Sequence, residues 1–110
     1  MEHTIHVDQD SHIVTLSGDV DLEHSPTART ILLDVVAQAK NIFVDLTSVS
    51  YMDSSGIASL VEAYQQAKKT GVSFVLISLS PAVFRVIRMA RLDKVFPIYE
   101  SLEMARHANV

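Results

Sequence analysis

The amino-acid sequence predicts a single α/β domain over residues 1–110, with a mixed, mostly parallel sheet, an N-terminal antiparallel hairpin and about four helices. Two short runs rich in β-branched residues flank a turn cluster near the N-terminus. The rest of the chain alternates apolar, strand-like runs with amphipathic helical stripes over short connections, which favours right-handed crossovers between parallel strands. No linker, repeat or low-complexity segment interrupts this order, so one domain is expected.

The hairpin is expected from residues 4–7 and 12–17, which read as strands on either side of a polar turn. Residues 18–24 then predict a polar loop. Val20 and Leu22 are the apolar residues expected to anchor that loop to the core.

The first helix is expected to start at Ser25-Pro26, with serine as the N-cap and proline at the first helical position. The inward stripe at helical spacing is Ala28, Ile31, Leu32, Val35, Val36 and Ala39. Lys40 and Asn41 suit a helix C-terminus, because a cation and a residue that tolerates left-handed backbone follow the last turn.

Residues 42–46 are nearly all apolar, which is typical of a strand covered on both faces. Residues 49–57 join that strand to a second helix, which is expected to end at Lys68-Lys69-Thr70-Gly71. The inward stripe of this helix is Ile57, Leu60, Val61 and Tyr64. Residues 72–78 predict another interior strand.

Ser80-Pro81 repeats the serine-proline pattern of a helix start and predicts a third helix. Residues 95–99 predict an edge strand, because a proline is tolerated in an edge strand. Ser101 is the expected cap of a last short helix. Residues expected to point inward are Val83, Val86, Ile87 and Ala90 on the third helix and Leu102, Met104 and Ala105 on the last. Met52, Met89 and Met104 are expected to fill the core.

Arg85, Arg88 and Arg91 recur on the side of the third helix opposite its apolar stripe. This pattern is typical of an ordinary solvated helix face. It also fits a patch that contacts an acidic partner or lipid headgroups.

The composition excludes several classes of protein. There is no cysteine, hence no disulfide framework and no cysteine-ligated metal, and no apolar run approaches the roughly 20 residues of a membrane span. The net charge of -4 argues against a general nucleic-acid binder. Residues 1–53 carry nine acids against two bases, whereas residues 54–110 carry four acids against seven bases. This asymmetry favours oriented docking to a charged partner, and the simplest reading is a cytoplasmic protein with no membrane insertion.

The sequence gives little support for an enzymatic function. The three glycines are isolated, so neither a dinucleotide fingerprint nor a phosphate-cradling loop is present. The five histidines lie near the termini, in the first hairpin or in a loop, and His3 and His6 point to opposite faces of a strand, which makes them a poor ligand pair. The serines at 54 and 55 lie in no Gly-x-Ser-x-Gly elbow, and no histidine has a compelling place near them. We therefore expect no catalytic residues, no metal and no cofactor.

The segment Asp53-Ser54-Ser55-Gly56 follows an apolar strand and opens a helix. Its simplest role is a helix cap, since Asp53 or Ser54 can accept a hydrogen bond from the first turn and stabilise the helix by about 1 kcal/mol. One cap satisfies that need, yet glycine in a first turn costs up to about 1 kcal/mol relative to alanine. A missing side chain lets another surface approach the Ser55 backbone closely, so the segment also suits a contact surface.

Together with Gly18-Asp19-Val20-Asp21 after the second strand, this segment resembles the STAS domain, named for sulfate transporters and anti-sigma factor antagonists. The resemblance extends over the whole chain in length, element order and both loops. It implies a free-standing anti-sigma factor antagonist, which binds an anti-sigma factor serine kinase when unphosphorylated, releases it when phosphorylated and is reset by a serine phosphatase.

By the same resemblance, Ser55 is the phosphorylated residue, and Asp21, Asp53, Ser54 and Gly56 form the partner-binding loops. Asp19 replaces a glutamate of the family pattern. Residues 58–59 (Ala-Ser) also depart from it, which affects the expected kinase contact.

Two other functions remain open. Some small STAS proteins are subunits of bacterial lipid-transport ATPase complexes, and the present chain resembles those as well. A helix N-terminus of this kind could also bind a small ligand or a nucleotide.

Overall fold

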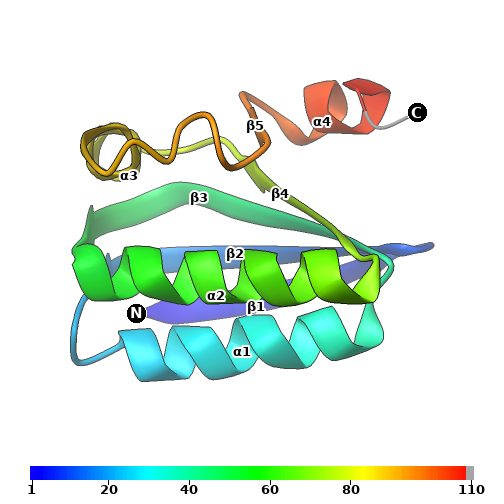
Figure 1. Cartoon of the computed structure of the whole chain (residues 1–110), viewed down its shortest axis with the longest axis horizontal. Helices are drawn as coiled ribbons and strands as arrows, with labels where there is room; N and C mark the ends of the chain where they lie inside the picture. The colour runs from blue at the N-terminus through cyan, green and yellow to red at the C-terminus, as the bar shows by residue number, and fades with distance from the viewer. Residues whose placement is uncertain (109–110) are drawn as a thin grey trace.

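A five-stranded sheet forms the centre of the fold in the computed structural model, which describes residues 1–108 (Figure 1). Its strands are β1 (Glu2–Asp8), β2 (Ser11–Val20), β3 (Asn41–Met52), β4 (Ser73–Ile77) and β5 (Ile98–Tyr99), in the spatial order β1-β2-β3-β4-β5. β1 pairs with β2 antiparallel, and the other three pairings are parallel. The helices are α1 (Ser25–Gln38), α2 (Ser54–Thr70), α3 (Pro81–Met89) and α4 (Leu102–Ala108). The predicted fold class is confirmed.

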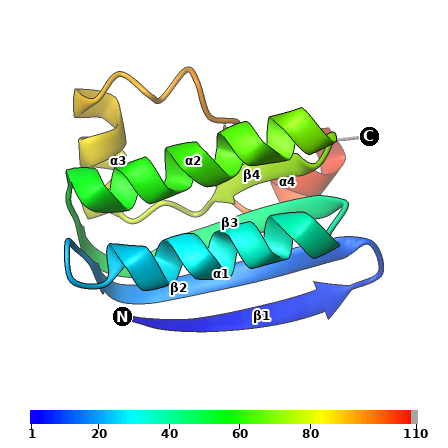
Figure 2. The ribbon, with the colours of Figure 1, turned by 60° about the horizontal axis from the view of Figure 1, so that its bottom comes forward.

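The main core lies between the sheet and helices α1 and α2, which run side by side across one face (Figures 1 and 2). From β3, Ile42, Val44 and Leu46 are buried in this core. The intervening Phe43 joins a smaller cluster with Val75, Ile77 and Ala105, the last from α4. β3 is therefore covered on both faces, because its alternate residues point to opposite sides of the sheet.

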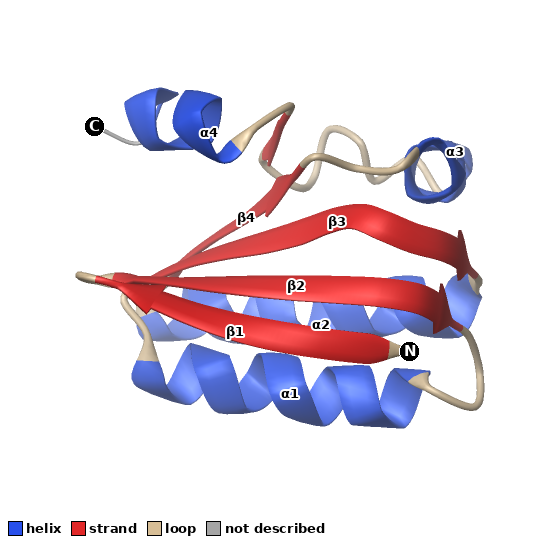
Figure 3. Ribbon diagram, turned by 180° about the vertical axis from the view of Figure 1, so that it is seen from behind, coloured by secondary structure: helices blue, strands red, loops and turns tan. Residues whose placement is uncertain are grey.

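The opposite face of the sheet is covered mainly at the β4–β5 side, whereas β1 and β2 lie open to view from behind (Figure 3). There α4 packs against β4 and β5, and Arg106 of α4 pairs with Asp8 at 3.0 Å. α3 instead joins the main core, where Val83 and Ile87 are fully buried, and it packs against β3.

Several predicted helix ends are confirmed. The side chain of Ser80 accepts a hydrogen bond from the Val83 N–H at 3.3 Å, and that of Ser101 accepts one from the Met104 N–H at 3.1 Å. Gly71 ends α2 in the left-handed conformation at a φ of 74°. These residues act as caps because helix ends leave backbone groups without intrahelical partners.

The start and end of α1 differ from the prediction. Ser25 does not cap the helix but is its first residue, and it is buried at 6% exposure. Its N–H bonds the Asp21 carbonyl at 2.7 Å, so the turn preceding the helix satisfies the backbone in place of a side-chain cap. Asn41 does not end α1 either, because the helix stops at Gln38 and Asn41 begins β3.

β2 and β3 are longer than predicted, and the polar loop is correspondingly shorter. Gly18, at a φ of 81°, lies within β2 near shifts in the pairing register with β3, so the strand continues to Val20. Val20 is buried as expected, but Leu22 is 76% exposed and does not anchor the loop. The edge strand β5 contains only Ile98 and Tyr99.

Three residues assigned to the core lie outside it. Met52 is buried, but Met89 is 78% exposed and Met104 is 50% exposed. Ala90 is exposed as well, because α3 ends at Met89 and the chain turns away there. In this nine-residue helix, Val83 and Ile87 are the buried residues, and Val86 is half-buried.

We predict that Gly71→Ala lowers the free energy of unfolding by about 1 kcal/mol, because a β-carbon disfavours the left-handed conformation. The effect is conformational, since an added β-carbon at Gly71 would meet no atom within 4 Å among residues 1–108, apart from its own chain neighbours. Gly71→Asn is the matched control and should lower the free energy of unfolding by less, because asparagine tolerates the left-handed conformation. Urea denaturation measures both variants, and an alanine variant as stable as wild type would contradict the prediction.

Candidate functional site

The carboxylate of Asp53 joins two loops at the edge of the sheet where the parallel strands end. One oxygen accepts hydrogen bonds from the Ser55 N–H at 3.0 Å and the Gly56 N–H at 3.3 Å, which caps α2. The other oxygen accepts a hydrogen bond from the Leu22 N–H at 3.1 Å, in the loop between β2 and α1. One side chain therefore caps the helix and holds the neighbouring loop against it.

The hydroxyl of Ser55 donates to the same Asp53 oxygen, Oδ1, across 2.5 Å. This hydrogen bond lowers the pKa of the Asp53 carboxyl; burial opposes the shift, and the N–H groups of Gly56, Ser55 and Leu22 reinforce it. Asp53 is thus held as a carboxylate, the form that accepts hydrogen bonds from all of these donors. Ser55 is half-buried in the first turn of α2, whereas Ser54 is exposed.

Gly56 is buried because α2 begins in direct contact with the end of β2. A β-carbon at this position would lie 2.5 Å from the Val20 carbonyl oxygen and 2.7 Å from Cγ of Met52. The surface that approaches the glycine is therefore this chain's own strand. This contact gives the absence of a side chain an internal reason, and it brings the Ser55 turn close against the sheet.

Ser59, one turn further along α2, ties the site to α1. Its Oγ lies 3.1 Å from the Ser25 carbonyl oxygen and 3.2 Å from that of Ser55. Outside it, Arg29 of α1 and Glu62 of α2 form an ion pair at 2.6 Å. A groove of about 250 Å³ lies between the two helices at this end, lined by Ser25, Pro26, Arg29, Ser55, Ala58, Ser59 and Glu62.

Asp21 lies in the adjoining loop, and its carboxylate accepts hydrogen bonds from His24, from Nδ1 at 2.7 Å and from the backbone N–H at 3.1 Å. Burial raises the pKa of the Asp21 carboxyl, but the hydrogen bonds and the charge of His24 outweigh burial, so the pKa is lowered. The ligand atoms of Asp21, Glu23 and His24 lie within 4.8 Å of one another. They could hold a cation, although His24 Nδ1 already bonds Asp21.

The structure gathers the five residues expected at the site. Asp53, Ser54, Ser55 and Gly56 share one helical turn, and Asp21 lies next to Leu22, which is bonded to Asp53. Sequence reasoning missed the roles of four other groups: the Leu22 N–H, His24, Ser59 and the Arg29–Glu62 pair. Only Ser59 carried a signal in the sequence, because a residue four positions after Ser55 lies on the same helix face.

The family is established by comparison with known proteins. The STAS domain family matches residues 4–105, and the chain therefore belongs to the STAS domain family. The anti-sigma F factor antagonist of Paenibacillus polymyxa is 30% identical over 81% of this chain and 78% of its own length. The resemblance predicted from the two loops is confirmed.

Solved structures share the fold. The crystal structure of an anti-sigma factor antagonist from Mycobacterium paratuberculosis matches 97% of this chain and 92% of its own, with 28% identity and a TM-score of 0.88. The phosphorylated form of the Bacillus cell fate determinant SpoIIAA matches 99% of this chain and all of its own, with 18% identity and a TM-score of 0.74. Within residues 1–108, no helix combines the length and the apolar character that a membrane crossing requires.

We predict that Gly56→Ala lowers the free energy of unfolding by about 1–3 kcal/mol, the usual cost of forcing an atom into a packed core. The Val20 carbonyl at 2.5 Å is backbone and cannot rotate away. The control is Ala58→Gly on the exposed face of the same turn. It should lower the free energy of unfolding by about 1 kcal/mol, through helix propensity alone. Thermal unfolding measures both, and a Gly56→Ala variant stabilised by its better propensity would refute the close contact.

We also predict a pH signature for Asp53. Because its pKa is lowered on folding, its stabilisation is fully present above the unfolded value of about 3.9 and is lost as the pH falls through the lower folded value. The Tm of Asp53→Asn should therefore lie below that of wild type at neutral pH, and the difference should shrink in acid. A difference in Tm that stays constant from neutral pH into acid would contradict this assignment.

Proposed function

We propose that this protein is an anti-sigma factor antagonist whose binding to an anti-sigma factor serine kinase is switched by phosphorylation of Ser55. The observation that carries the proposal is the position of the Ser55 hydroxyl, held by Asp53 in the first turn of α2 at the edge where the loops gather. Its relatives bear the name anti-sigma factor antagonist, and a protein of this fold has a phosphorylated form.

The helix N-terminus explains how the fold would tolerate a phosphate. A phosphoserine carries about -1.5 to -2 charges at neutral pH, and the dipole and N–H groups of a first turn favour an anion. The phosphate would compete with Asp53 for the N–H groups of Ser55 and Gly56, which the carboxylate now occupies. We expect the sheet and α2 to persist, with the change concentrated on the surface around Ser55.

The new charge would act on docking. The Asp53 carboxylate is bonded to Ser55, and Asp21 precedes Leu22, whose N–H is bonded to Asp53, so a dianion on Ser55 would add to a negative charge already present there. One unfavourable charge pair at about 6 Å and an effective dielectric of about 20 costs roughly 2.8 kcal/mol. That is enough for a loss of about 100-fold in affinity.

In this proposal the protein acts by binding, in the cytoplasm, and has no catalytic residue of its own. Asp21, Asp53 and Ser54 would contact the kinase, and buried Gly56 would hold the Ser55 turn in position. A serine phosphatase would return Ser55 to the hydroxyl form.

We predict that Ser55→Ala keeps kinase binding but accepts no phosphate, whereas Ser55→Asp weakens binding with little change in Tm. Ser54→Ala, next to it and exposed, is the control and should still be phosphorylated. The measurements are intact mass and peptide mapping after incubation with candidate anti-sigma factor kinases and ATP, and calorimetry of binding. Phosphate found only on another residue, or stable association with transporter ATPase subunits in place of a kinase, would refute the proposal.

A further inference from the structure

α3 presents an exposed surface that is both basic and apolar. Phe84 is 42% exposed and Met89 is 78% exposed. With Pro81, Arg85 and Arg88 they line a groove of about 380 Å³, and the Arg88 guanidinium lies 6.0 Å from the centre of the Phe84 ring. We call these five residues the α3 face.

Among residues 1–108, neither Arg85 nor Arg88 of the α3 face forms an ion pair. α3 contains no acidic residue, and exposed Arg91 and Lys94 follow it. Among residues 1–108, the arginines that form ion pairs are Arg29 and Arg106, neither of which lies on α3. The α3 face therefore suits a partner that combines carboxylates with an apolar side chain.

The loop between β2 and α1 has that chemistry. Leu22 is 76% exposed, and Asp19, Asp21 and Glu23 surround it in the sequence. The loop is held in place, because the Leu22 N–H bonds Asp53 at 3.1 Å. We call residues 19–23, which comprise the last two residues of β2 and the start of this loop, the acidic loop. Its exposed leucine is available to fill an apolar groove on another molecule, and its carboxylates can face arginines.

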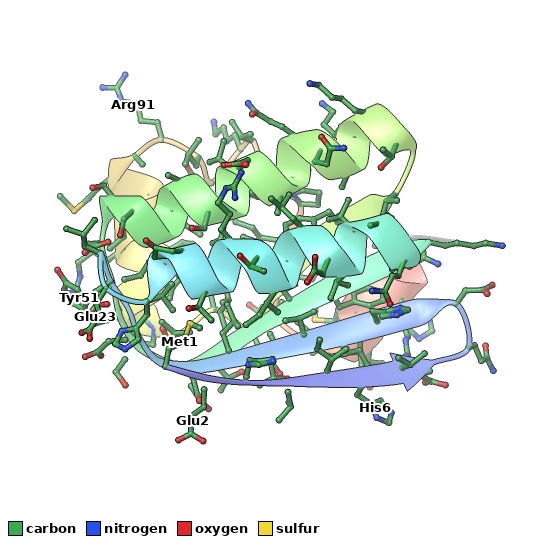
Figure 4. The ribbon with its side chains drawn as sticks, turned by 90° about the horizontal axis from the view of Figure 1, so that it is seen from below. Met1, Glu2, His6, Glu23, Tyr51 and Arg91 are labelled. Atoms are coloured by element: carbon green, nitrogen blue, oxygen red, sulfur yellow. The ribbon has the colours of Figure 1, made fainter. Side chains whose placement is uncertain are left out.

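The two surfaces flank Ser55. Since β2, β3 and β4 are parallel neighbours in this order, the acidic loop, the Ser55 turn and α3 follow their ends in the same order along one edge. Figure 1 shows α3, the start of α2 and the loop into α1 at the same end of the molecule. In Figure 4, Glu23 and Tyr51 also lie at that end, and Tyr51 is 51% exposed.

We propose that a second copy of this chain docks here, with the acidic loop of each copy on the α3 face of the other. Because the complementary surfaces lie on the two sides of one edge, a twofold axis near Ser55 would satisfy both contacts at once. Such an arrangement is isologous and closes as a dimer, with no free end to extend.

The association would be weak and sensitive to salt. Each copy carries a net charge of -4, so the copies repel overall and only the local complementarity holds them together. Charges on exposed surfaces are screened within about 10 Å at 0.1 M salt. The dimer would cover Ser55, and under the proposed function it would compete with the kinase. That consequence rests on the proposed function, whereas the association itself does not.

Sedimentation equilibrium tests the proposal with the protein alone, from about 10 µM to about 1 mM, the range in which small interfaces associate. We expect a monomer–dimer equilibrium that weakens at least tenfold between about 50 mM and about 500 mM NaCl. A monomer throughout, growth beyond the dimer, or insensitivity to salt would overturn it. The proposal would also be overturned if the protein stayed monomeric and bound phosphatidylglycerol vesicles through α3, because the α3 face would then contact an anionic membrane.

Charge exchange provides the specific control. Asp19→Arg with Glu23→Arg, or Arg85→Glu with Arg88→Glu, should each weaken the dimer at least tenfold, and all four together should restore it. Asp34→Arg and Lys40→Glu, exposed and outside both surfaces, should change little. Failure of the fourfold variant to associate, when circular dichroism shows it folded, would overturn the pairing.

The wild-type protein gives a second test that needs no variant. On dilution, amide chemical shifts should change in the acidic loop, the Ser55 turn and α3, and not along the open edge of β1. Changes confined to β1 would overturn the proposal. Phosphorylation of Ser55 by a kinase is a separate measurement, so the proposed function and this dimer can fail independently.

Discussion

The site depends on the hydrogen bonds of one carboxylate. Asp53 accepts from the first turn of α2, from the Ser55 hydroxyl and from the Leu22 N–H of the adjoining loop. The cap of α2, the orientation of the candidate phosphorylation site and the position of the acidic loop therefore have a common cause. A modification of Ser55 would act first on this carboxylate, because no other charged group is bonded to that hydroxyl among residues 1–108.

The parallel sheet brings the remaining parts together. Parallel strands end at the same edge, so the acidic loop, the Ser55 turn and α3 become neighbours although they are far apart in the chain. Gly56 makes this arrangement compact, since only a residue without a β-carbon lets α2 begin against the Val20 carbonyl. The resulting edge is acidic on one side of Ser55 and basic on the other, a distribution suited to oriented docking.

The errors of sequence reasoning at this edge have one origin. The sequence predicts that Leu22 anchors a loop and that Met89 fills the core, because apolar residues are usually buried, yet both lie on the surface. Ser25 is a residue type that often caps helices, but the turn before it already bonds its backbone, since the Ser25 N–H donates to the Asp21 carbonyl. In each case the residue type gave the general preference, and the local geometry of the chain decided otherwise: a backbone turn at Ser25 and the end of α3 at Met89.

The sequence by itself determined the order of the elements, the parallel sheet, the family and the residues of the Ser55 turn. Periodicity, turn residues and the motif Asp53-Ser54-Ser55-Gly56 are local signals that need no knowledge of distant contacts. Only the tertiary structure decided that Asp53 reaches across to Leu22, that Gly56 meets Val20 and that α3 lies on the far side of Ser55 from the acidic loop. These relations depend on which strands are neighbours and on where the register between them shifts, and no local pattern encodes either.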